Sequence, residues 1–281
     1  MLIIVETTNP DRINPAVGTR SKLPASYIFE TKQQGNGAAS ARVLAANGAK
    51  VFGCDLNLAA AQHTQRRVDA EGGDCTVVSA DVDKDADVKF LMEACVARYG
   101  GRIDTLINNV GRSEPGGPAK MSEEAWDSQM DVNLKSVLLS YHYVLPIMKS
   151  QEGGGAIVNV SSIAGMRYIG KPQVAYSATK AAAIQFTKVT AVIYAKRGAR
   201  LNVVVPRLIH TPLVGLLADK YVWGWDLEGF VERRHKAVPM GGMGDSFDVA
   251  YSVAFWLLNR RSISLDRRSL WIGELLHPLV S

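Results

Sequence analysis

Residues 50–205 alternate short apolar runs with long amphipathic runs, and this alternation limits the possible folds more than any other feature. The short runs are apolar without interruption, which is typical of strands that are covered on both faces. They span residues 50–55, 76–79, 105–108, 156–161 and 201–205. Regular alternation of strands and helices predicts an α/β fold with a doubly wound, mostly parallel sheet.

Helices are expected between these strands, and they fix where a ligand can bind. The amphipathic runs span residues 58–71, 85–99, 122–149 and 174–196. The third opens with Ser-Glu-Glu, which suits a helix N-terminus. In open α/β sheets, ligands bind at the carboxyl ends of the strands. We therefore expect the functional residues at that edge.

The two ends of the chain do not follow the alternation. Residues 1–25 contain several prolines and no periodicity, which predicts an irregular N-terminal arm. The short run at 27–30, Tyr-Ile-Phe-Glu, is a candidate first strand. One domain is expected over residues 26–260, followed by an atypical tail at 261–281.

Composition excludes several classes of protein. Hydrophobic residues make up 47% and charged residues 21% of the 281 residues, as in ordinary globular proteins. No apolar run is long enough to span a membrane. The net charge is +5, but the basic residues are spread out, so nucleic-acid binding is not expected. The three cysteines suggest buried thiols in a reducing compartment, the cytoplasm, and no metal site is expected.

A glycine-containing segment, Gly35-Asn36-Gly37, precedes the helical run at residues 38–47. Glycines at such a junction let the backbone approach a pyrophosphate at the helix N-terminus. Asp55 ends the next strand, where a carboxylate binds the two hydroxyls of an adenosine ribose and repels a 2′-phosphate. The alternatives are a surface turn for the glycines and a helix cap for Asp55.

The strand at 156–161 leads to Ser161 and Ser162, and Tyr176 and Lys180 follow on one helix. Residues at i and i+4 share one helix face. A neighbouring ammonium favours the phenolate and lowers the pKa of a tyrosine from about 10. A serine hydroxyl can bind a substrate oxygen as charge develops on it. The alternative is an amphipathic helix with an exposed tyrosine and lysine.

Several segments, in order and spacing, resemble the short-chain dehydrogenase/reductase family, in its non-extended, NAD-preferring form. The resemblance covers about residues 35–258 and is carried by Asn108-Asn-Val-Gly111, Asp131-Val-Asn133, the run at 157–165, Tyr176-Ser-Ala-Thr-Lys180, the run at 202–206 and Ile209-His-Thr-Pro212. It implies a single Rossmann-like domain with helices on both faces of a sheet of six to seven strands. It also implies a substrate lid at about residues 212–240.

The resemblance also implies roles for individual residues. Tyr176 is expected to be the general acid/base, Lys180 its pKa-lowering partner, Ser162 the group that binds the substrate oxygen, and Asn133 part of a proton relay. The cofactor is expected to be NAD. Its binding residues are expected to be Gly35, Asn36, Gly37, Asp55, Leu56, Asp81, Val82, Asn108, Asn109, Gly111, Tyr176, Lys180, Pro206, Ile209 and Thr211.

Three features depart from the family pattern. Lys32 stands where the glycine loop normally begins, and the loop is one residue short. Arg207 replaces the glycine that normally follows Pro206, near the expected nicotinamide. The tail lacks the usual last-strand motif.

The expected activity is NAD(H)-dependent hydride transfer between a secondary alcohol or cyclic diol, or the corresponding ketone, and nicotinamide. The expected partners are a small-molecule substrate and further copies of the chain, as a homodimer or homotetramer. The alternative is a Rossmann-like protein without catalysis that serves as a scaffold or subunit partner, because Lys32, Arg207 and the tail depart from the pattern.

Overall fold

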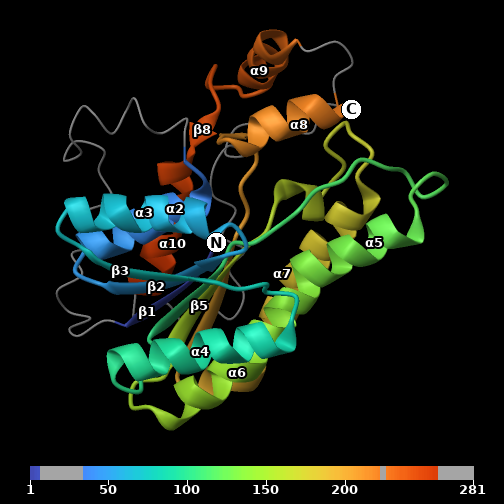
Figure 1. Cartoon of the computed structure of the whole chain (residues 1–281). Coiled ribbons are helices and arrows are strands. Elements are labelled where there is room, and N and C mark those ends of the chain that lie inside the picture. Colours follow the sequence, from blue (N-terminus) through green and yellow to red (C-terminus); the bar gives the residue numbers. More distant parts are fainter. Residues whose placement is uncertain (7–33, 222–225, 259–281) are drawn as a thin grey trace.

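The chain folds around one mixed sheet flanked by two layers of helices (Figure 1). The computed structural model describes residues 1–6, 34–221 and 226–258. The six-stranded sheet has the order β3-β2-β1-β4-β5-β6. Its strands are β1 (Leu2–Glu6), β2 (Lys50–Asp55), β3 (Asp74–Ser79), β4 (Thr105–Asn108), β5 (Gly155–Val160) and β6 (Ala199–Val204).

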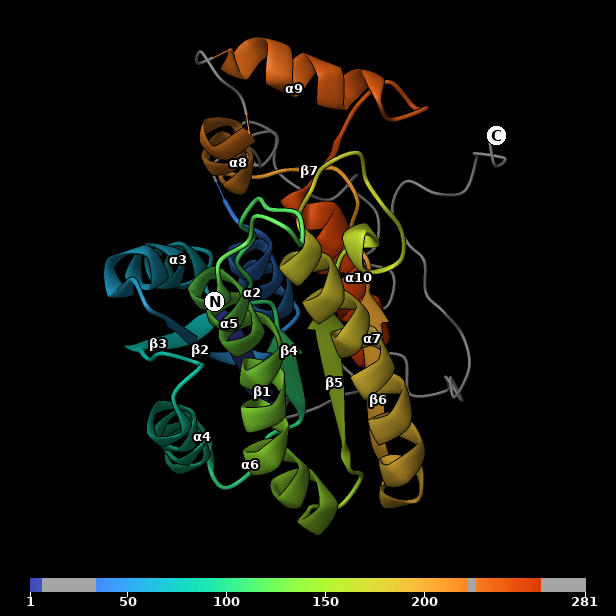
Figure 2. The ribbon, with the colours of Figure 1, turned by 90° about the vertical axis from the view of Figure 1, so that its right-hand side faces the viewer.

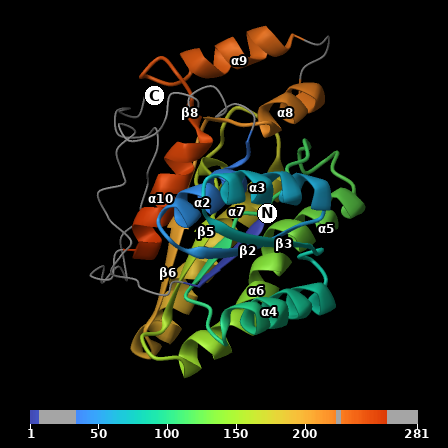
Figure 3. The same cartoon turned by 60° about the vertical axis from the view of Figure 1, so that its left-hand side comes forward.

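Helices cover both faces of this sheet, as Figures 1 and 3 both show. On one face lie α2 (Asn36–Ala46), α3 (Leu58–Ala70) and α10 (Ser246–Leu258), and on the other α4 (Asp85–Tyr99), α5 (Glu123–Met130), α6 (Ser136–Ser150) and α7 (Val174–Tyr194). Each face has its own hydrophobic cluster, so the sheet separates two cores. The predicted doubly wound α/β architecture is confirmed.

The predicted strands that pair in parallel are confirmed nearly to the residue. β2, β4 and α4 begin and end where the sequence predicts, and β5 and β6 differ by one or two residues. β2 pairs in parallel with β3, and β5 pairs in parallel with β4 and β6. The predicted helix over 122–149 is interrupted by a π-helix at Asp131–Lys135, which joins α5 to α6.

The N-terminal residues correct one prediction. Residues 1–25 were expected to form an irregular arm, but Leu2–Glu6 forms β1, in the middle of the sheet. β1 is antiparallel to both of its neighbours, β2 and β4. The prediction was wrong because it relied on the prolines and missed a short apolar run. Residues 7–25 of the predicted arm, the candidate strand at 27–30, Lys32 and the tail at 261–281 lie outside the described residues.

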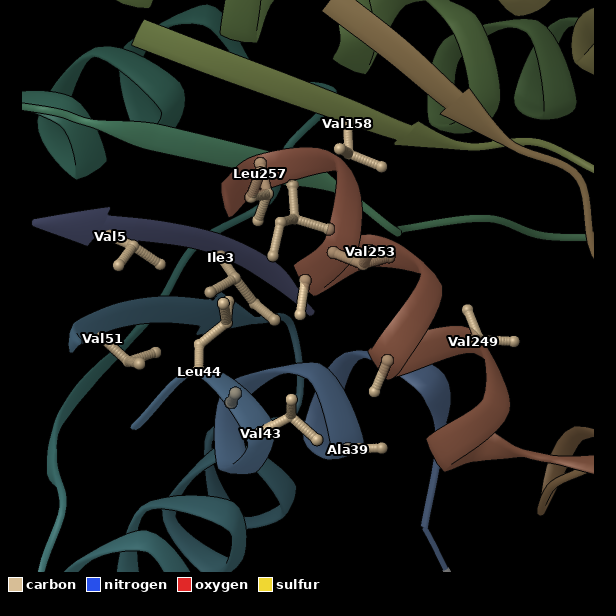
Figure 4. Packing of buried hydrophobic residues seen from close by; sticks show 14 of the residues in the cluster. Ile3, Val5, Ala39, Val43, Leu44, Val51, Val158, Val249, Val253 and Leu257 are labelled. Atoms are coloured by element: carbon tan, nitrogen blue, oxygen red, sulfur yellow. The ribbon is translucent and has the colours of Figure 1, made fainter. Parts of the chain in front are cut away.

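Alternation of side chains explains why this short segment is central. Successive side chains of a strand point to opposite faces. Ile3 and Val5 pack with α2 and α10, whereas Leu2 and Ile4 belong to the cluster on the other face. Figure 4 shows Ile3 close to Leu44 and to the helix that carries Val253, with Val5 further along the same strand. β1 therefore joins both cores.

Two shorter helices stand beyond the carboxyl ends of the parallel strands (Figure 2). They are α8 (Leu213–Tyr221) and α9 (Leu227–Lys236), within the segment expected to be a lid. A two-stranded sheet of β7 (Ile209–His210) and β8 (Gly244–Asp245) connects this region to the domain. The small cluster of Val214, Ala218 and Phe230 holds the two helices together.

The three cysteines, Cys54, Cys75 and Cys95, are buried free thiols, as predicted. Burial raises the pKa of Cys54 to about 11 and the pKa values of Cys75 and Cys95 to about 12. Such thiols stay protonated and unreactive at neutral pH. In the described ranges, no helix combines the length and apolarity needed to cross a membrane.

Because β1 lies in the middle of the sheet, truncating one of its buried side chains should lower the stability of the fold substantially. Ile3 is fully buried, so Ile3→Ala should lower the free energy of unfolding by about 2–5 kcal/mol. The control is Phe90→Ala on α4, whose side chain is 54% exposed and which should cost far less. Urea denaturation of both variants measures the difference. Equal stabilities would contradict the placement of β1 in the sheet.

Candidate active site

A cavity of about 920 Å³ lies at the carboxyl ends of β4, β5 and β6, and residues of α8 and α9 form part of its wall. This is the edge at which the sequence predicts ligand binding. Many of the predicted site residues line it, namely Asn36, Asn109, Gly111, Ser162, Tyr176, Lys180, Pro206, Ile209 and Thr211.

Helix α7 delivers Tyr176 and Lys180 to this cavity from one face. The Lys180 ammonium nitrogen, Nζ, lies 5.7 Å from the centre of the Tyr176 ring. Tyr176 is half-buried, so its ring is accessible from the cavity, whereas only 5% of Lys180 is exposed. The two residues predicted to act together therefore lie together.

Lys180 is a buried cation, which makes its charge state adjustable. Its Nζ donates a hydrogen bond to the carbonyl oxygen of Val160, at the end of β5, over 3.0 Å. Burial lowers the pKa of Lys180 to about 8, because a low-dielectric surrounding disfavours the ammonium. A lysine side chain with this pKa can exchange its proton near neutral pH.

Both serines at the end of β5 line the cavity, but they differ in burial and in their hydrogen bonds. The Ser161 hydroxyl is buried and donates to the backbone carbonyl of Lys180 over 2.8 Å. Ser162 is half-buried and lines the cavity, and its Oγ accepts a hydrogen bond from the backbone N–H of Ala164 over 3.2 Å. This bond caps the short 3₁₀ helix Ile163–Gly165. Ser162 is the better placed of the two to reach a ligand.

Asn133 lies in the π-helix and holds the loop that follows β4. Its Oδ1 accepts from the backbone N–H of Arg112 over 2.7 Å, and its Nδ2 donates to the Arg112 carbonyl over 2.8 Å. Nδ2 also donates to the hydroxyl of Thr179 on α7. A Cβ on Gly111 would lie 3.1 Å from Lys180 Nζ and 3.4 Å from Asn133 Oδ1. Gly111 thus brings Asn133 and Lys180 together.

A second hollow, of about 330 Å³, adjoins the N-terminus of α2 and shares Asn109 with the cavity. Gly35, Gly37 and Asp55 line it, so the glycines predicted to approach a pyrophosphate and the carboxylate predicted to bind an adenosine ribose lie on one hollow. Oδ1 of Asp55 accepts from the backbone N–H of Asn57. Asn57, and not Asp55, provides the side-chain cap of α3, so the cap alternative for Asp55 is not supported.

Met1 also lines this second hollow. Its α-amino nitrogen lies 3.2 Å from Oδ2 of Asp55. A Cβ on Gly37 would lie 3.0 Å from Cβ of Met1 and 2.9 Å from Nδ2 of Asn109. The antiparallel direction of β1 explains this contact, since it directs the start of the strand toward the carboxyl ends of its neighbours.

The residues around the two hollows fit a nicotinamide dinucleotide. Nε2 of Gln34 and Oδ1 of Asn36 are buried without a hydrogen-bond partner beside the N-terminus of α2. Buried polar groups without partners cost free energy, which a polar ligand can recover. Gly37 has no room for a side chain, because Asn109 and Met1 lie against it. At Asp55, the ribose hydroxyls of a bound dinucleotide would share the carboxylate with the α-amino group of Met1.

Four predicted cofactor residues lie away from both hollows among the described residues. Leu56 is 71% exposed, and Val82 is buried in a hydrophobic cluster. Oδ1 of Asp81 accepts from the backbone N–H of Asp83. Asn108 is buried, and its Nδ2 donates to Oδ1 of Asn159 over 2.7 Å. Asn108 therefore links β4 to β5, and its neighbour Asn109 faces the ligand space.

Sequence reasoning missed a group of basic side chains around the cavity. Lys171 lies before α7, and Arg234 lies on α9. The only signal in the sequence is the adjacent pair Arg233-Arg234, which does not by itself indicate a binding site. Arg207, which replaces the glycine expected after Pro206, also lines the cavity.

Comparisons with known proteins identify relatives of this chain among oxidoreductases. The family model described as enoyl-(acyl carrier protein) reductase matches residues 31–264. The 2,5-dichloro-2,5-cyclohexadiene-1,4-diol dehydrogenase LinX of Sphingobium indicum is 33% identical over 222 residues, which cover 79% of this chain and 84% of the relative.

Solved structures give the same result. A short-chain dehydrogenase/reductase from Burkholderia xenovorans has a TM-score of 0.75 and 43% identity, covering 80% of this chain and 84% of that one. A variant of actinorhodin polyketide ketoreductase solved with NADPH has a TM-score of 0.75 and 29% identity, covering 81% of this chain and 87% of that one.

The chain belongs to the short-chain dehydrogenase/reductase family. It is an oxidoreductase of the alcohol and ketone type, and members of this family use a nicotinamide cofactor. The fold, the position of the cavity and the sequence motifs lead to the same class.

The buried ammonium of Lys180 predicts a pH-dependent effect on stability. Above pH 8 the folded chain releases this proton, while an unfolded lysine keeps it to about pH 10.4. The unfolded state then binds more protons, so the stability of the wild type rises with pH. Relative to Lys180→Met, the wild type should therefore gain up to about 3 kcal/mol between pH 7 and 10.

Chemical denaturation at several pH values measures this gain. Lys188→Met is the control, because Lys188 lies on the same helix with an exposed side chain. The difference in stability between the wild type and Lys188→Met should stay constant over this pH range. A difference between wild type and Lys180→Met that stays constant with pH would contradict a buried, titrating Lys180.

Proposed function

We propose that the protein is an NAD(H)-dependent oxidoreductase that interconverts a secondary alcohol or cyclic diol and the corresponding ketone. The observation that carries the proposal is the joint placement of Tyr176, Lys180 and Ser162 on one cavity. When bound, the nicotinamide supplies the acceptor or donor of hydride. The protein supplies position and proton transfer.

Tyr176 is the general acid/base of this proposal. In oxidation, its phenolate accepts the hydroxyl proton of the alcohol while hydride leaves the carbinol carbon. In reduction, the phenol returns that proton to the carbonyl oxygen. The ammonium of Lys180 beside the ring favours the phenolate and brings the tyrosine closer to its working range. The Ser162 hydroxyl, on the cavity wall, donates to the substrate oxygen as charge develops.

Asn133 and Lys180 form the route by which the proton returns to solvent. A Cβ placed on Gly111 would meet both of their polar atoms, so the two side chains approach the same point. A water at this point can receive the proton from Lys180, whose pKa of about 8 suits transfer at neutral pH. Asn133 positions this route because its amide is held by the backbone of Arg112.

NAD is the proposed cofactor, and Asp55 carries this choice. Its carboxylate lines the second hollow and is one-third exposed, at 33%. A carboxylate there accepts hydrogen bonds from the ribose hydroxyls and repels a 2′-phosphate. One ketoreductase neighbour was solved with NADPH, so membership of the family does not by itself select NAD. The proposal for this chain therefore depends on Asp55.

We further propose a cytoplasmic homodimer or homotetramer. Apolar side chains are exposed on α6 and α7, and they are Leu138, Val189, Val192 and Ile193. Exposed apolar groups on long helices suit burial against another copy of the chain. The buried free cysteines suit a reducing compartment. The scaffold alternative is not favoured, because three of the four predicted catalytic residues, Ser162, Tyr176 and Lys180, line one cavity and the relatives are oxidoreductases.

Replacing the proposed acid/base should abolish most of the activity. Tyr176→Phe should lower kcat by about 10²-fold or more, because the hydroxyl proton loses its acceptor. NADH binding should be largely unchanged. The control is Tyr143→Phe, which removes a hydroxyl bonded to Asp85 outside the cavity. Comparable turnover by wild type and Tyr176→Phe would refute the assignment.

Cofactor selection can be tested by thermal unfolding with NADH and, in parallel, NADPH. A cofactor that binds only the folded state at a hundredfold excess over Kd stabilises it by about 2.7 kcal/mol. NADH should raise Tm more than NADPH does, and Asp55→Asn should reduce that difference by removing the repulsion of the 2′-phosphate. If neither cofactor raises the Tm of the folded wild type, the proposed function is wrong.

A further inference from the structure

Helices α8 and α9 form part of the cavity wall and are attached to the domain beside the small sheet of β7 and β8. α8 begins shortly after β7, and the N–H of Val214 donates to the carbonyl of Thr211 over 2.9 Å. α9 ends near β8, where Nδ1 of His235 accepts from the N–H of Met243 over 3.0 Å. The residues of α8 that line the cavity are Leu213, Val214 and Leu217.

The two helices pack on each other and not on the main cores. Their apolar cluster, of Val214, Ala218 and Phe230, is separate from the two clusters that cover the sheet. In the part of the chain that the structure describes, no residue of α8 or α9 belongs to either larger cluster. A ring contact also reaches the domain, since Nζ of Lys171 lies 4.4 Å from the centre of the Phe230 ring. Elements with few apolar contacts to the rest of a fold open at a small cost in free energy.

Lys220 joins the far end of α8 to the loop after β4. It lies in the last turn of α8, about 10 Å along the helix axis from Leu213. Its Nζ lies 2.7 Å from Oε1 of Glu114 and also donates to the carbonyl of Ser113 over 3.4 Å. The side chain of Lys220 is 37% exposed and that of Glu114 is 20% exposed. Because the pair is partly shielded from water, salt screens it less than a fully exposed pair.

Glu114 is held in place by α5 and by a neighbouring arginine. Its N–H donates to Oε1 of Gln129 over 3.0 Å, and Gln129 is fully buried. Nε of Arg112 donates to the same carboxylate oxygen that Lys220 contacts, over 2.8 Å. Burial acts to raise the pKa of Glu114, but the hydrogen bonds and charges of Lys220 and Arg112 lower it below its ordinary value. The carboxylate is therefore an ionised partner for Lys220 at neutral pH.

The loop that carries Glu114 is fixed to the elements of the active site. The backbone of Arg112 is bonded to the side chain of Asn133 in the π-helix. Further along the loop, the N–H of Gly116 donates to the carbonyl of Pro172, just before α7, over 2.9 Å. Because the loop is held on both sides, its ion pair with α8 ties the far end of that helix to the catalytic part of the domain.

We propose that Lys220 and Glu114 form a latch between α8 and the loop after β4, which opens each time a ligand enters or leaves the cavity. α8 and α9 then act as a lid that pivots on the small sheet of β7 and β8. Such an ion pair can open readily, because pairs with access to water contribute only modestly to stability. Both are positioning residues and not catalytic ones. The inference rests on the proposed function for one ligand, NADH, whose nicotinamide end is expected in this cavity.

A latch and a binding contact have different kinetic signatures. A side chain that holds a ligand chiefly slows its release, so removing that side chain raises the dissociation rate constant and Kd together. A latch slows entry and release alike. Removing it therefore raises the association and dissociation rate constants by the same factor and leaves Kd unchanged.

Stopped-flow fluorescence with NADH measures both rate constants. Lys220→Met should raise each of them by about twofold to fivefold, as expected for the loss of one partly exposed ion pair. Glu114→Gln and the double variant should give the same increase, because the second substitution removes nothing further. Lys220→Arg should keep the wild-type rates, since a guanidinium can pair with the same carboxylate. Glu114 keeps Arg112 as a partner in Lys220→Met, so this variant should fold, and thermal unfolding checks that it does.

Lys236→Met is the matched control on α9. Its ammonium is 74% exposed and lies 3.3 Å from Glu232 on the same helix. The substitution removes one positive charge and one ion pair from the lid, but that pair lies within a single helix. The rate constants of this variant for NADH should be those of the wild type.

Hydrogen exchange tests the latch without any ligand. The amides of α8 should exchange about twofold to fivefold faster in Lys220→Met, whereas those of α5 and α7 should exchange as in the wild type. If NADH does not bind to the folded wild type but α8 exchanges faster in Lys220→Met, the latch stands and the proposed function fails.

Several results would overturn the latch. The first is unchanged exchange of α8, or unchanged rate constants for a bound NADH, in folded Lys220→Met. The second is a rise in the dissociation rate constant and Kd with a constant association rate constant, which would make Lys220 a binding contact. The third is an equal increase in Lys236→Met, which would assign the effect to the net charge of the lid.

Discussion

The attachment of α7 to the end of β5 is the constraint on which the rest of the site depends. Lys180 makes two hydrogen bonds across this contact. Its Nζ donates to the carbonyl of Val160, and its own carbonyl accepts from the Ser161 hydroxyl. The turn after β5 approaches the helix so closely that a Cβ on Gly165 would lie 2.6 Å from the Lys180 carbonyl carbon. Because the helix cannot shift along the strand, Tyr176 is held at the cavity.

Much of the fold could be predicted from the sequence, because parallel strands covered on both faces are continuous apolar runs. For this reason, the predicted bounds of β2 and β4 agree with the structure at both ends. β1 was missed because its apolar run is short and stands before a proline-containing segment, and because no local pattern distinguishes an antiparallel insertion from a parallel one. The π-helix at Asp131–Lys135 was also missed, since its sequence continues the apolar pattern of an ordinary helix.

The candidate site divides in the same way. Tyr176, Lys180 and Ser162 could be found because one helix face and one strand end bring them together. The group of Lys171 and Arg234 could not, because only the packing of α9 against the cavity brings these two distant residues to one ring. Asn108 was predicted to line the cofactor, but its amide nitrogen donates a hydrogen bond to Asn159 on the neighbouring strand. Spacing along the chain cannot reveal a contact between two strands.

The antiparallel direction of β1 has a consequence for assembly of the sheet. β2 and β3 form one parallel unit, and β4, β5 and β6 form another. Among the strands that the structure describes, only β1 connects these two units through main-chain hydrogen bonds. A chain in which this strand is detached would present two unsatisfied edges separated by a slot one strand wide. Such a slot accepts an extended segment of either direction, so the same geometry that completes the monomer also makes strand exchange between molecules possible.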